Sequence, residues 1–230
     1  MNPRLAWLFD VDGTLLMTEG AARAAFAGAV RDRLGIEDDL ADVPFAGRTE
    51  PRILADILGK HGRSFDPEDE ARFWNSVFDH MRRELRPGRG RMMPGIPGLL
   101  DRIAAVPGWA LGLLTGNMTQ MARIKLGHFG LRGYFGFGAF GEMAPDRDAL
   151  ARDLVERVGR ERGIPPRRCV VVGDTPHDVA CARAAGAHVI AVATGTVARA
   201  ELEPLGPDLM LDDLSDAEAV IAWARRVDEG

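Results

Sequence analysis

The sequence contains little cysteine and no long apolar run. The two cysteines, Cys169 and Cys181, show no pattern of paired spacings, which excludes a disulfide framework and favours a reducing compartment. The N-terminal segment reaches an acid at Asp10, too early for a signal peptide. Because no stretch of about 18 apolar residues occurs, no membrane span is expected. We therefore predict a cytoplasmic protein with no membrane partner.

Lysine is also scarce, and the charge is not that of a nucleic-acid binder. Of the 29 basic residues only Lys60 and Lys125 are lysines, so a catalytic lysine would be easy to locate. The net charge is −5, whereas general nucleic-acid binders are more often basic, so no nucleic-acid partner is expected. The composition, 46% hydrophobic and 27% charged over 230 residues, is typical of a globular chain of one or two domains.

Hydrophobic spacing divides the chain into an alternating part and an all-helical part. Residues 4–9 predict a buried strand, and helical spacing follows over 18–34, 50–60 and 67–85. Prolines and glycines over 87–98 indicate a linker. Beyond it, predicted helices alternate with predicted strands: helices over 99–106, 119–129, 146–159, 177–185 and 215–227, and strands over 110–114, 137–140, 169–172, 188–192 and 208–211.

This alternation predicts an α/β fold with a doubly wound, Rossmann-like parallel sheet. The first strand is separated from the other strands by the helical stretch. We therefore predict a core formed by residues 1–16 and 93–230, with an α-helical cap inserted over residues 17–92.

Acidic residues and one hydroxyl follow three of the predicted strands. Asp10 and Asp12 follow the first strand, and Thr115 follows the second. Asp174 and Asp178 follow a later strand. Because open α/β sheets build their sites at the carboxyl ends of strands, these side chains are expected in one crevice. Clustered carboxylates need a compensating cation, and oxygen ligands without a histidine or cysteine cluster indicate Mg²⁺.

These motifs, in this order, resemble the haloacid dehalogenase-like hydrolase superfamily. The matching features are Asp10-Val-Asp12-Gly-Thr, a strand ending at Thr115, and Gly-Asp174-xxx-Asp178. The helical insertion resembles the small helical cap of the superfamily, and the segment 93–100 resembles the return to the core in its phosphoglycolate phosphatase branch. The resemblance covers nearly the whole chain. It implies a Mg²⁺-dependent phosphoric monoester hydrolase, a monomer or homodimer, that acts on a small phosphorylated metabolite, with phosphoglycolate the first candidate.

The resemblance also implies a role for each motif residue. Asp10 would be the nucleophile that forms an aspartyl-phosphate, and Asp12 would protonate the leaving alcohol and then activate water. Asp10, the backbone carbonyl of Asp12, and Asp174 would hold Mg²⁺, with Asp178 acting on the ion directly or through water. Thr115 would bind phosphoryl oxygens.

The lysine that the family places ahead of its last acidic motif is missing from residues 141–150. Arg147 is the first candidate to supply its positive charge in catalysis, and Lys125 is the second. A third alternative is that neither residue replaces it.

Further residues are predicted to contact the substrate. Gly116 and Asn117 follow Thr115 directly, and Lys125 lies on the next predicted helix. Arg48 lies between two helices of the insertion, where it would reach a carboxylate or a second phosphate of the substrate.

Two other functions stay open at this point. One is a sugar phosphomutase of the same branch. The other is a non-catalytic binding protein on this scaffold, which the missing lysine motivates. Dehalogenation is disfavoured because a departing halide needs no acid, whereas Asp12 suits an alcohol leaving group.

Overall fold

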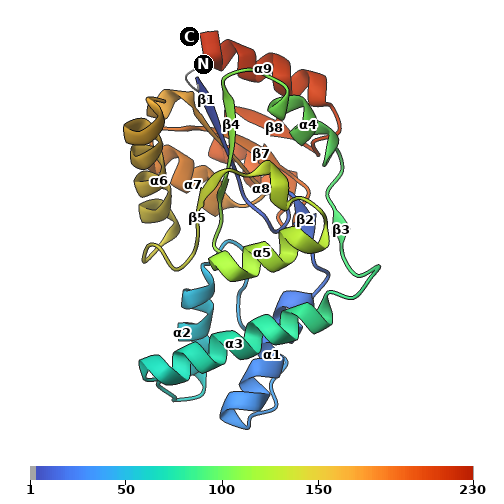
Figure 1. The fold of residues 1–230 in the computed structure, drawn as a ribbon, viewed down its shortest axis with the longest axis vertical. Coiled ribbons are helices and arrows are strands. Elements are labelled where there is room, and N and C mark those ends of the chain that lie inside the picture. Colours follow the sequence, from blue (N-terminus) through green and yellow to red (C-terminus); the bar gives the residue numbers. More distant parts are fainter. Residues whose placement is uncertain (1–3, 230) are drawn as a thin grey trace.

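A parallel sheet forms one end of the molecule, and three helices form the other (Figure 1). The structure is a computed structural model that describes residues 4–229. The sheet contains β1 (Leu5–Phe9), β4 (Trp109–Leu114), β5 (Phe137–Ala139), β6 (Cys169–Gly173), β7 (His188–Val192) and β8 (Leu209–Leu211). The strand order is β5-β4-β1-β6-β7-β8, and every neighbouring pair is parallel.

Helices cover both faces of this sheet. They are α4 (Gly98–Ala104), α5 (Thr119–His128), α6 (Arg147–Arg162), α7 (Pro176–Ala184), α8 (Arg199–Leu202) and α9 (Ala217–Glu229), with short 3-10 turns at Arg132–Tyr134, Pro166–Arg168 and Glu203–Leu205. Helices α4 and α9 pack on one face, and α6 and α7 pack on the other. The predicted α/β fold class with a doubly wound parallel sheet is confirmed.

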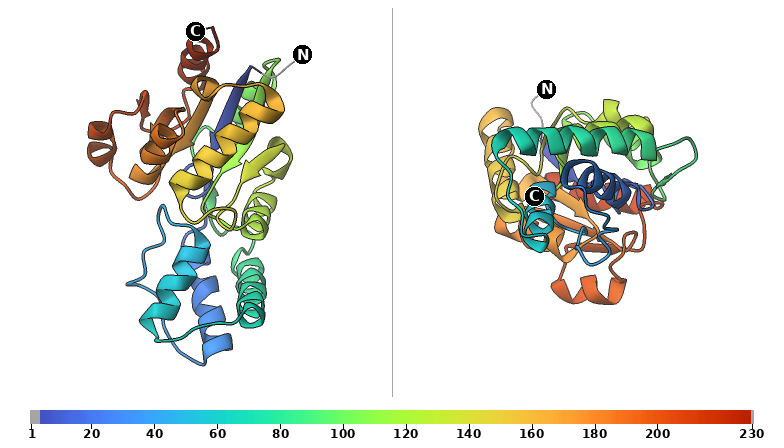
Figure 2. Two further views of the ribbon diagram at one scale, coloured as in Figure 1. Left: turned by 90° about the vertical axis from the view of Figure 1, so that its left-hand side faces the viewer. Right: turned by 90° about the horizontal axis from the view of Figure 1, so that it is seen from below.

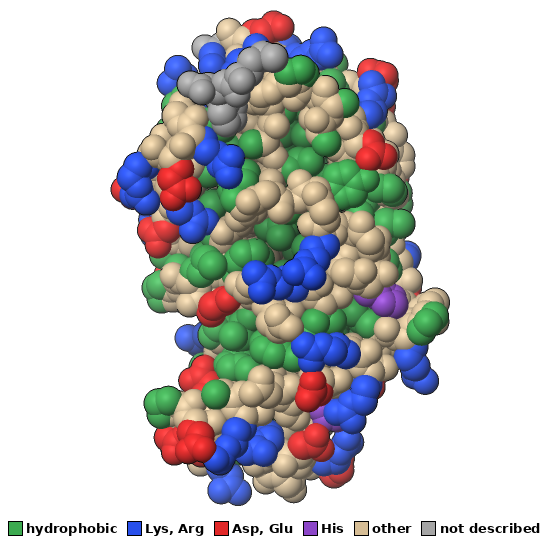
Figure 3. Space-filling model, in the orientation of Figure 1, with side chains coloured by type: hydrophobic (Ala, Val, Ile, Leu, Met, Phe, Trp, Pro, Cys, Tyr) green, Lys and Arg blue, Asp and Glu red, His purple; other side chains and the backbone are tan. Residues whose placement is uncertain are grey.

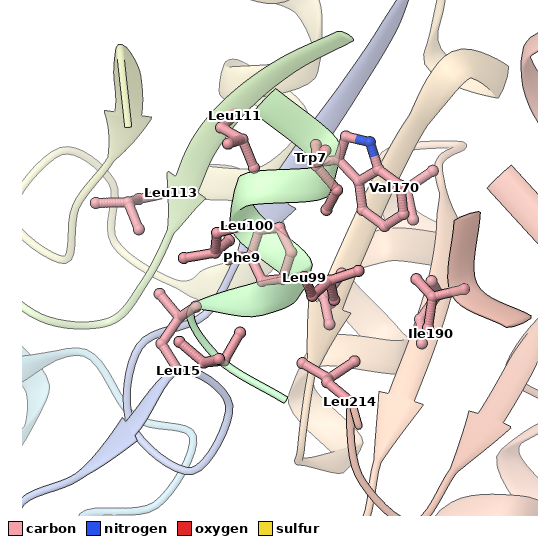
Figure 4. Packing of buried hydrophobic residues seen from close by; sticks show 14 of the residues in the cluster. Trp7, Phe9, Leu15, Leu99, Leu100, Leu111, Leu113, Val170, Ile190 and Leu214 are labelled. Atoms are coloured by element: carbon pink, nitrogen blue, oxygen red, sulfur yellow. The ribbon is translucent and has the colours of Figure 1, made fainter. Parts of the chain in front are cut away.

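The central strand β1 is apolar throughout because both of its faces are buried. Trp7 and Phe9 point into the cluster beneath α4 and α9, and Leu8 points into the cluster on the opposite face. Figure 4 shows Trp7 and Phe9 among the leucines of that first cluster. Each buried side chain of this size contributes about 2 kcal/mol to folding. The first acid of the motif therefore stands at the end of a rigid, fully packed strand.

The helical part comprises α1 (Ala21–Leu34), α2 (Glu50–Lys60) and α3 (Pro67–Glu84). Its helices share a third apolar cluster, which includes Phe26 and Phe73. Asp66 starts α3 by accepting a hydrogen bond from the Asp69 amide, with a proline at the first helical position. The left view of Figure 2 shows that these helices lie beyond one end of the sheet.

A short ribbon joins the two parts where the chain leaves the core and where it returns. Strand β2 (Leu16–Met17) pairs antiparallel with β3 (Arg91–Met92). The sequence analysis missed this ribbon, since two-residue strands are too short to show an alternating pattern. It also missed the four-residue helix α8 and the 3-10 turns, which are too short to show helical periodicity. The remaining differences are small shifts of element ends: the helix predicted over 146–159 continues to Arg162. Within residues 4–229, no helix is long and apolar enough to cross a membrane.

Candidate active site

A cleft of about 220 Å³ lies between the carboxyl ends of the strands and the helical part. In Figure 3 the outline of the molecule is notched between these two parts. Every predicted site residue lines the cleft except Asp178, which is fully buried just behind it. The predicted residues that line it are Asp10, Asp12, Arg48, Thr115, Gly116, Asn117, Lys125, Arg147 and Asp174.

Three carboxylates meet at the floor of the cleft. Asp10, Asp174 and Asp178 are buried, and each offers an oxygen within 4.8 Å of the others. Burial raises the pKa of Asp10 to about 6 and that of Asp174 to about 8, and the neighbouring acids add to both shifts. Such shifts mean that the protein alone does not compensate the negative charge. This donor set of hard carboxylate oxygens suits a divalent cation.

The loops at the strand ends hold these acids in place. Thr14 Oγ1 donates to Asp174 Oδ1 at 3.1 Å, and Thr175 donates to Asp178 Oδ2 through its amide and its hydroxyl. A Cβ atom on Gly13 would stand 2.3 Å from Asp174, and the φ of Gly13 is +83°. Only glycine fits at this position of the motif.

Arg147 supplies the positive charge on this floor. Its Nη2 donates to Asp178 Oδ1 and lies 3.4 Å from Asp10 Oδ1. Burial works to lower the pKa of Arg147, but Asp178 and Asp10 outweigh it and raise the pKa above its ordinary value. Asp146 caps α6 by accepting from the Ala149 amide, which starts the helix at Arg147 and directs that side chain inward. The structure thus places Arg147, and not Lys125, beside Asp10.

Lys125 and Asn117 contact Asp12 instead. Lys125 Nζ and Asn117 Nδ2 each lie 2.7 Å from Asp12 Oδ2. Lys125 also donates to Asn117 Oδ1 at 2.5 Å, and Asn117 Nδ2 donates to Thr115 Oγ1 at 2.8 Å. Both side chains are buried, and no hydrogen bond to Asp12 Oδ1 forms within residues 4–229. Their predicted role in substrate binding stays a prediction.

The helical part is hydrogen-bonded to the floor at Glu50. The Glu50 amide donates to the Gly116 carbonyl at 2.8 Å, and Glu50 Oε2 accepts from the Met118 amide at 2.8 Å. Burial raises the pKa of Glu50 to about 8. A Cβ atom on Gly116 would stand 2.2 Å from the carbonyl oxygen of Arg48. The sequence analysis missed Glu50 because an acid in the first turn of a helix is common for local reasons.

Arg48 lines the cleft but is already paired. Its Nη1 lies 2.7 Å from Asp56 Oδ2 on α2. Arg52 also contacts Asp56, at 3.1 Å. The predicted contact between Arg48 and the substrate stays a prediction.

Comparison with known proteins identifies the family of the chain. Residues 6–186 match the family model of the haloacid dehalogenase-like hydrolases. A 5'-nucleotidase of Pseudomonas aeruginosa is 30% identical over 221 residues, which cover 93% of this chain and 94% of that protein. A phosphoglycolate phosphatase of Chromobacterium violaceum is 27% identical over 220 residues, 90% of this chain and 92% of that one.

Two further similarities extend the comparison. CbbY of Rhodobacter sphaeroides, solved in complex with phosphate, superimposes with a TM-score of 0.75 at 25% identity, covering 94% of this chain and 96% of that one. The chloroplast protein SUPPRESSOR OF QUENCHING 1 of Arabidopsis thaliana is 29% identical over 221 residues. That match covers 92% of this chain, which spans about a fifth of the length of the plant protein (20%).

The chain belongs to the haloacid dehalogenase-like hydrolase family. The predicted family, with relatives in its phosphoglycolate phosphatase branch, and the predicted enzyme class of hydrolase are therefore confirmed.

Proposed function

We propose that this chain is a Mg²⁺-dependent phosphatase that hydrolyses a small phosphomonoester through an aspartyl-phosphate on Asp10. The observation that carries the proposal is the floor of the cleft, where Asp10 lies among two further carboxylates and beside the guanidinium of Arg147. Relatives named as phosphatases and a nucleotidase support the same reaction class. Phosphoglycolate is the first substrate to test.

The two aspartates of the first motif would have different roles, Asp10 as the nucleophile and Asp12 as the general acid and base. Asp10 attacks phosphorus, and the bond from phosphorus to the substrate oxygen breaks while Asp12 donates a proton to that oxygen. The alcohol then leaves. Asp12, now a carboxylate, takes a proton from water, whose oxygen attacks the phosphorus of the aspartyl-phosphate. Phosphate is released and Asp10 is regenerated.

The contacts of Asp12 suggest a different role for each of its two carboxyl oxygens. Lys125 and Asn117 both bind Oδ2, which leaves Oδ1 to exchange the proton with the substrate oxygen or with water. Lys125 and Asn117 are then positioning residues that act through Asp12. An acid whose orientation is held in advance loses little entropy when the reaction begins.

Thr115 and Arg147 would bind the phosphoryl group. Thr115 Oγ1 accepts hydrogen bonds from the Asn117 amide and from Asn117 Nδ2, so its own proton is directed elsewhere, toward a phosphoryl oxygen. Arg147 Nη2, which lies 3.4 Å from Asp10 Oδ1, would donate to a phosphoryl oxygen of the substrate. Donors fixed in advance around a developing charge stabilise the transition state strongly.

Asp10, Asp174, Asp178 and the backbone carbonyl of Asp12 would hold Mg²⁺. The raised pKa values of Asp10 and Asp174 fit a site whose negative charge is meant for a cation. When bound, the ion neutralises the acids and draws negative charge from the phosphoryl oxygens.

Residues 17–92 would act as a cap over the core of residues 1–16 and 93–230. The cleft lies between these parts, so movement of the cap would admit substrate and then exclude water. A volume of about 220 Å³ lies below the ~300–1,000 Å³ common for ligand sites, which favours a substrate of a few carbons. The cytoplasmic location and the monomeric or dimeric state stay predictions.

The test is phosphate release from a panel of small phosphomonoesters, with and without Mg²⁺, using Asp10→Asn as the blank. We expect metal-dependent release that falls by more than about 10⁴-fold in the variant, since removing a nucleophile removes the whole covalent route. Release that persists in folded Asp10→Asn would contradict the proposal. So would a folded, Mg²⁺-binding chain that releases phosphate from no compound of the panel.

A further inference from the structure

The basic residues of the cleft differ in how their charges are matched. Four of them line it: Arg23, Arg48, Lys125 and Arg147. The last three each form an ion pair with a carboxylate described above. Within residues 4–229, Arg23 has no carboxylate oxygen within 4.0 Å. Among the described residues, Arg23 is therefore the only basic residue of the cleft whose positive charge is not paired with a carboxylate.

Neutral groups hold the Arg23 side chain in place. Its Nη1 donates to the Leu40 carbonyl and, at 3.2 Å, to the Val43 carbonyl. Its guanidinium carbon lies 4.6 Å from the centroid of the Phe45 ring, which also lines the cleft. These contacts orient the guanidinium without neutralising it. Its Nε and Nη2 form no hydrogen bond within the described part of the chain.

A guanidinium held in this way is suited to bind an anion. Its remaining N–H groups form a planar fork that matches a carboxylate or a phosphate. Because Arg23 lies on α1 and Asp10 follows β1, the two residues approach the cleft from the helical part and from the sheet. A substrate whose phosphoryl group is at Asp10 would extend its other end toward the helical part.

We propose that Arg23 binds a second anionic group of the substrate, a carboxylate or a further phosphate, at the end remote from the transferred phosphoryl group. This inference rests on the proposed function and narrows its substrate class. It assigns to Arg23 the recognition that the sequence analysis expected of Arg48, whose charge Asp56 already matches. A monoester with an uncharged remote end would lose this contact.

The test is binding to the Asp10→Asn chain in Mg²⁺, which needs no turnover. Calorimetry compares 2-phosphoglycolate with 2-hydroxyethyl phosphate, which has a neutral hydroxymethyl group in place of the carboxylate. Arg23→Gln is expected to weaken 2-phosphoglycolate binding about 10- to 100-fold, the size of a charged hydrogen bond, and hydroxyethyl phosphate binding less than about threefold. Arg23→Lys keeps the charge and should lose less. Propane-1,3-diol bisphosphate measures the preference for a second phosphate.

Arg33→Gln is the matched control, since it removes an exposed positive charge from the same helix away from the cleft. Equal weakening of both ligands by Arg23→Gln would show that Arg23 only ties the loop before α2 to α1, and would overturn the inference. The inference would also be overturned if the Asp10→Asn chain bound neither 2-phosphoglycolate nor propane-1,3-diol bisphosphate more tightly than 2-hydroxyethyl phosphate. Phosphate release by the unmutated chain tests the proposed function separately.

Discussion

The floor and the roof of the cleft are built in different ways. On the floor, buried cations contact carboxylates directly, as Arg147 contacts Asp10 and Lys125 contacts Asp12. On the roof, formed by residues 17–92, Arg48 pairs with Asp56, but among the described residues Arg23 is held only by carbonyls and an aromatic ring. The acids of the floor follow packed strands and its cations lie on α5 and α6, whereas the roof helices pack around a separate apolar cluster.

This difference suggests that the floor carries out the chemical step and the roof recognises the substrate. Acids at the ends of rigid strands, paired with buried cations, are held in the geometry that bond breaking requires. Contacts between roof and floor at Glu50 are two single hydrogen bonds, one from its amide and one to its carboxyl group, which can break and form again at small cost. We therefore expect changes on the floor to alter the rate of the chemical step, and changes on the roof to alter binding, closure or stability.

After the loss expected on replacing Asp10 itself, the largest effect is expected at Arg147. Arg147→Ala should lower kcat by about 10²- to 10³-fold and change KM much less, because the guanidinium stabilises charge that develops at the phosphoryl group. Steady-state kinetics on the best substrate of the panel measures both constants. The change also leaves buried acids unpaired, so folding must be checked by circular dichroism.

Arg147→Lys is the matched variant, because it keeps the positive charge and removes the fork. Partial recovery of kcat would support the charge as the essential property. A loss confined to KM in Arg147→Ala would instead make Arg147 a substrate-binding residue on the floor.

The next effect is expected at Lys125 and depends on the leaving group. Lys125→Met should lower kcat/KM for an alkyl phosphate about 100-fold, because Asp12 is no longer held to protonate the departing oxygen. For p-nitrophenyl phosphate the loss should be less than about fivefold, since nitrophenolate leaves without a proton. Lys60→Met, which changes the other lysine at an exposed ion pair, is the control. Equal losses on both substrates would exclude the positioning role.

A smaller effect is expected where roof and floor approach most closely. Gly116→Ala should lower kcat/KM about tenfold, because the added Cβ would stand 2.2 Å from the carbonyl oxygen of Arg48 and would push the roof outward. Gly127→Ala is the control, as a Cβ there meets nothing within 4 Å. Unchanged kinetics in Gly116→Ala would show that this close approach is not needed for turnover.

The smallest effect on turnover is expected at Glu50, where the readout is stability against pH. Its pKa is raised from 4.5 to about 8, so the folded chain binds this proton more tightly than the unfolded chain. The contribution of protonated Glu50 to the free energy of unfolding is complete below pH 4.5 and is lost as pH rises to about 8. Glu50→Gln does not ionise, so its unfolding free energy should rise relative to the unmutated chain across this window, by a few kcal/mol at most.

Urea unfolding at several pH values measures this difference. Glu142→Gln is the control, because Glu142 accepts from the neighbouring Thr119 amide but is exposed. A constant difference between Glu50→Gln and the unmutated chain from pH 4.5 to 8 would show that Glu50 is not held as a neutral acid.

The sequence alone determined the strands of the large sheet, most of the helices, and the acids that follow the strands. The five-residue apolar run before Asp10 is long enough only for a strand buried on both faces, and polar side chains that follow parallel strands gather at one edge. Local rules of this kind placed Asp10, Thr115 and Asp174 in one cleft, and the resemblance to the family named Arg147 as a source of charge.

Only the tertiary structure decided which charges meet. The pairing of Lys125 with Asp12, the capping of α5 by Glu50, and the unmatched charge of Arg23 join or separate residues that are distant along the chain. No periodic pattern encodes such contacts, because a side chain's partner depends on how whole helices pack. Residue type and spacing define which groups are available, and burial then decides which of them must be paired.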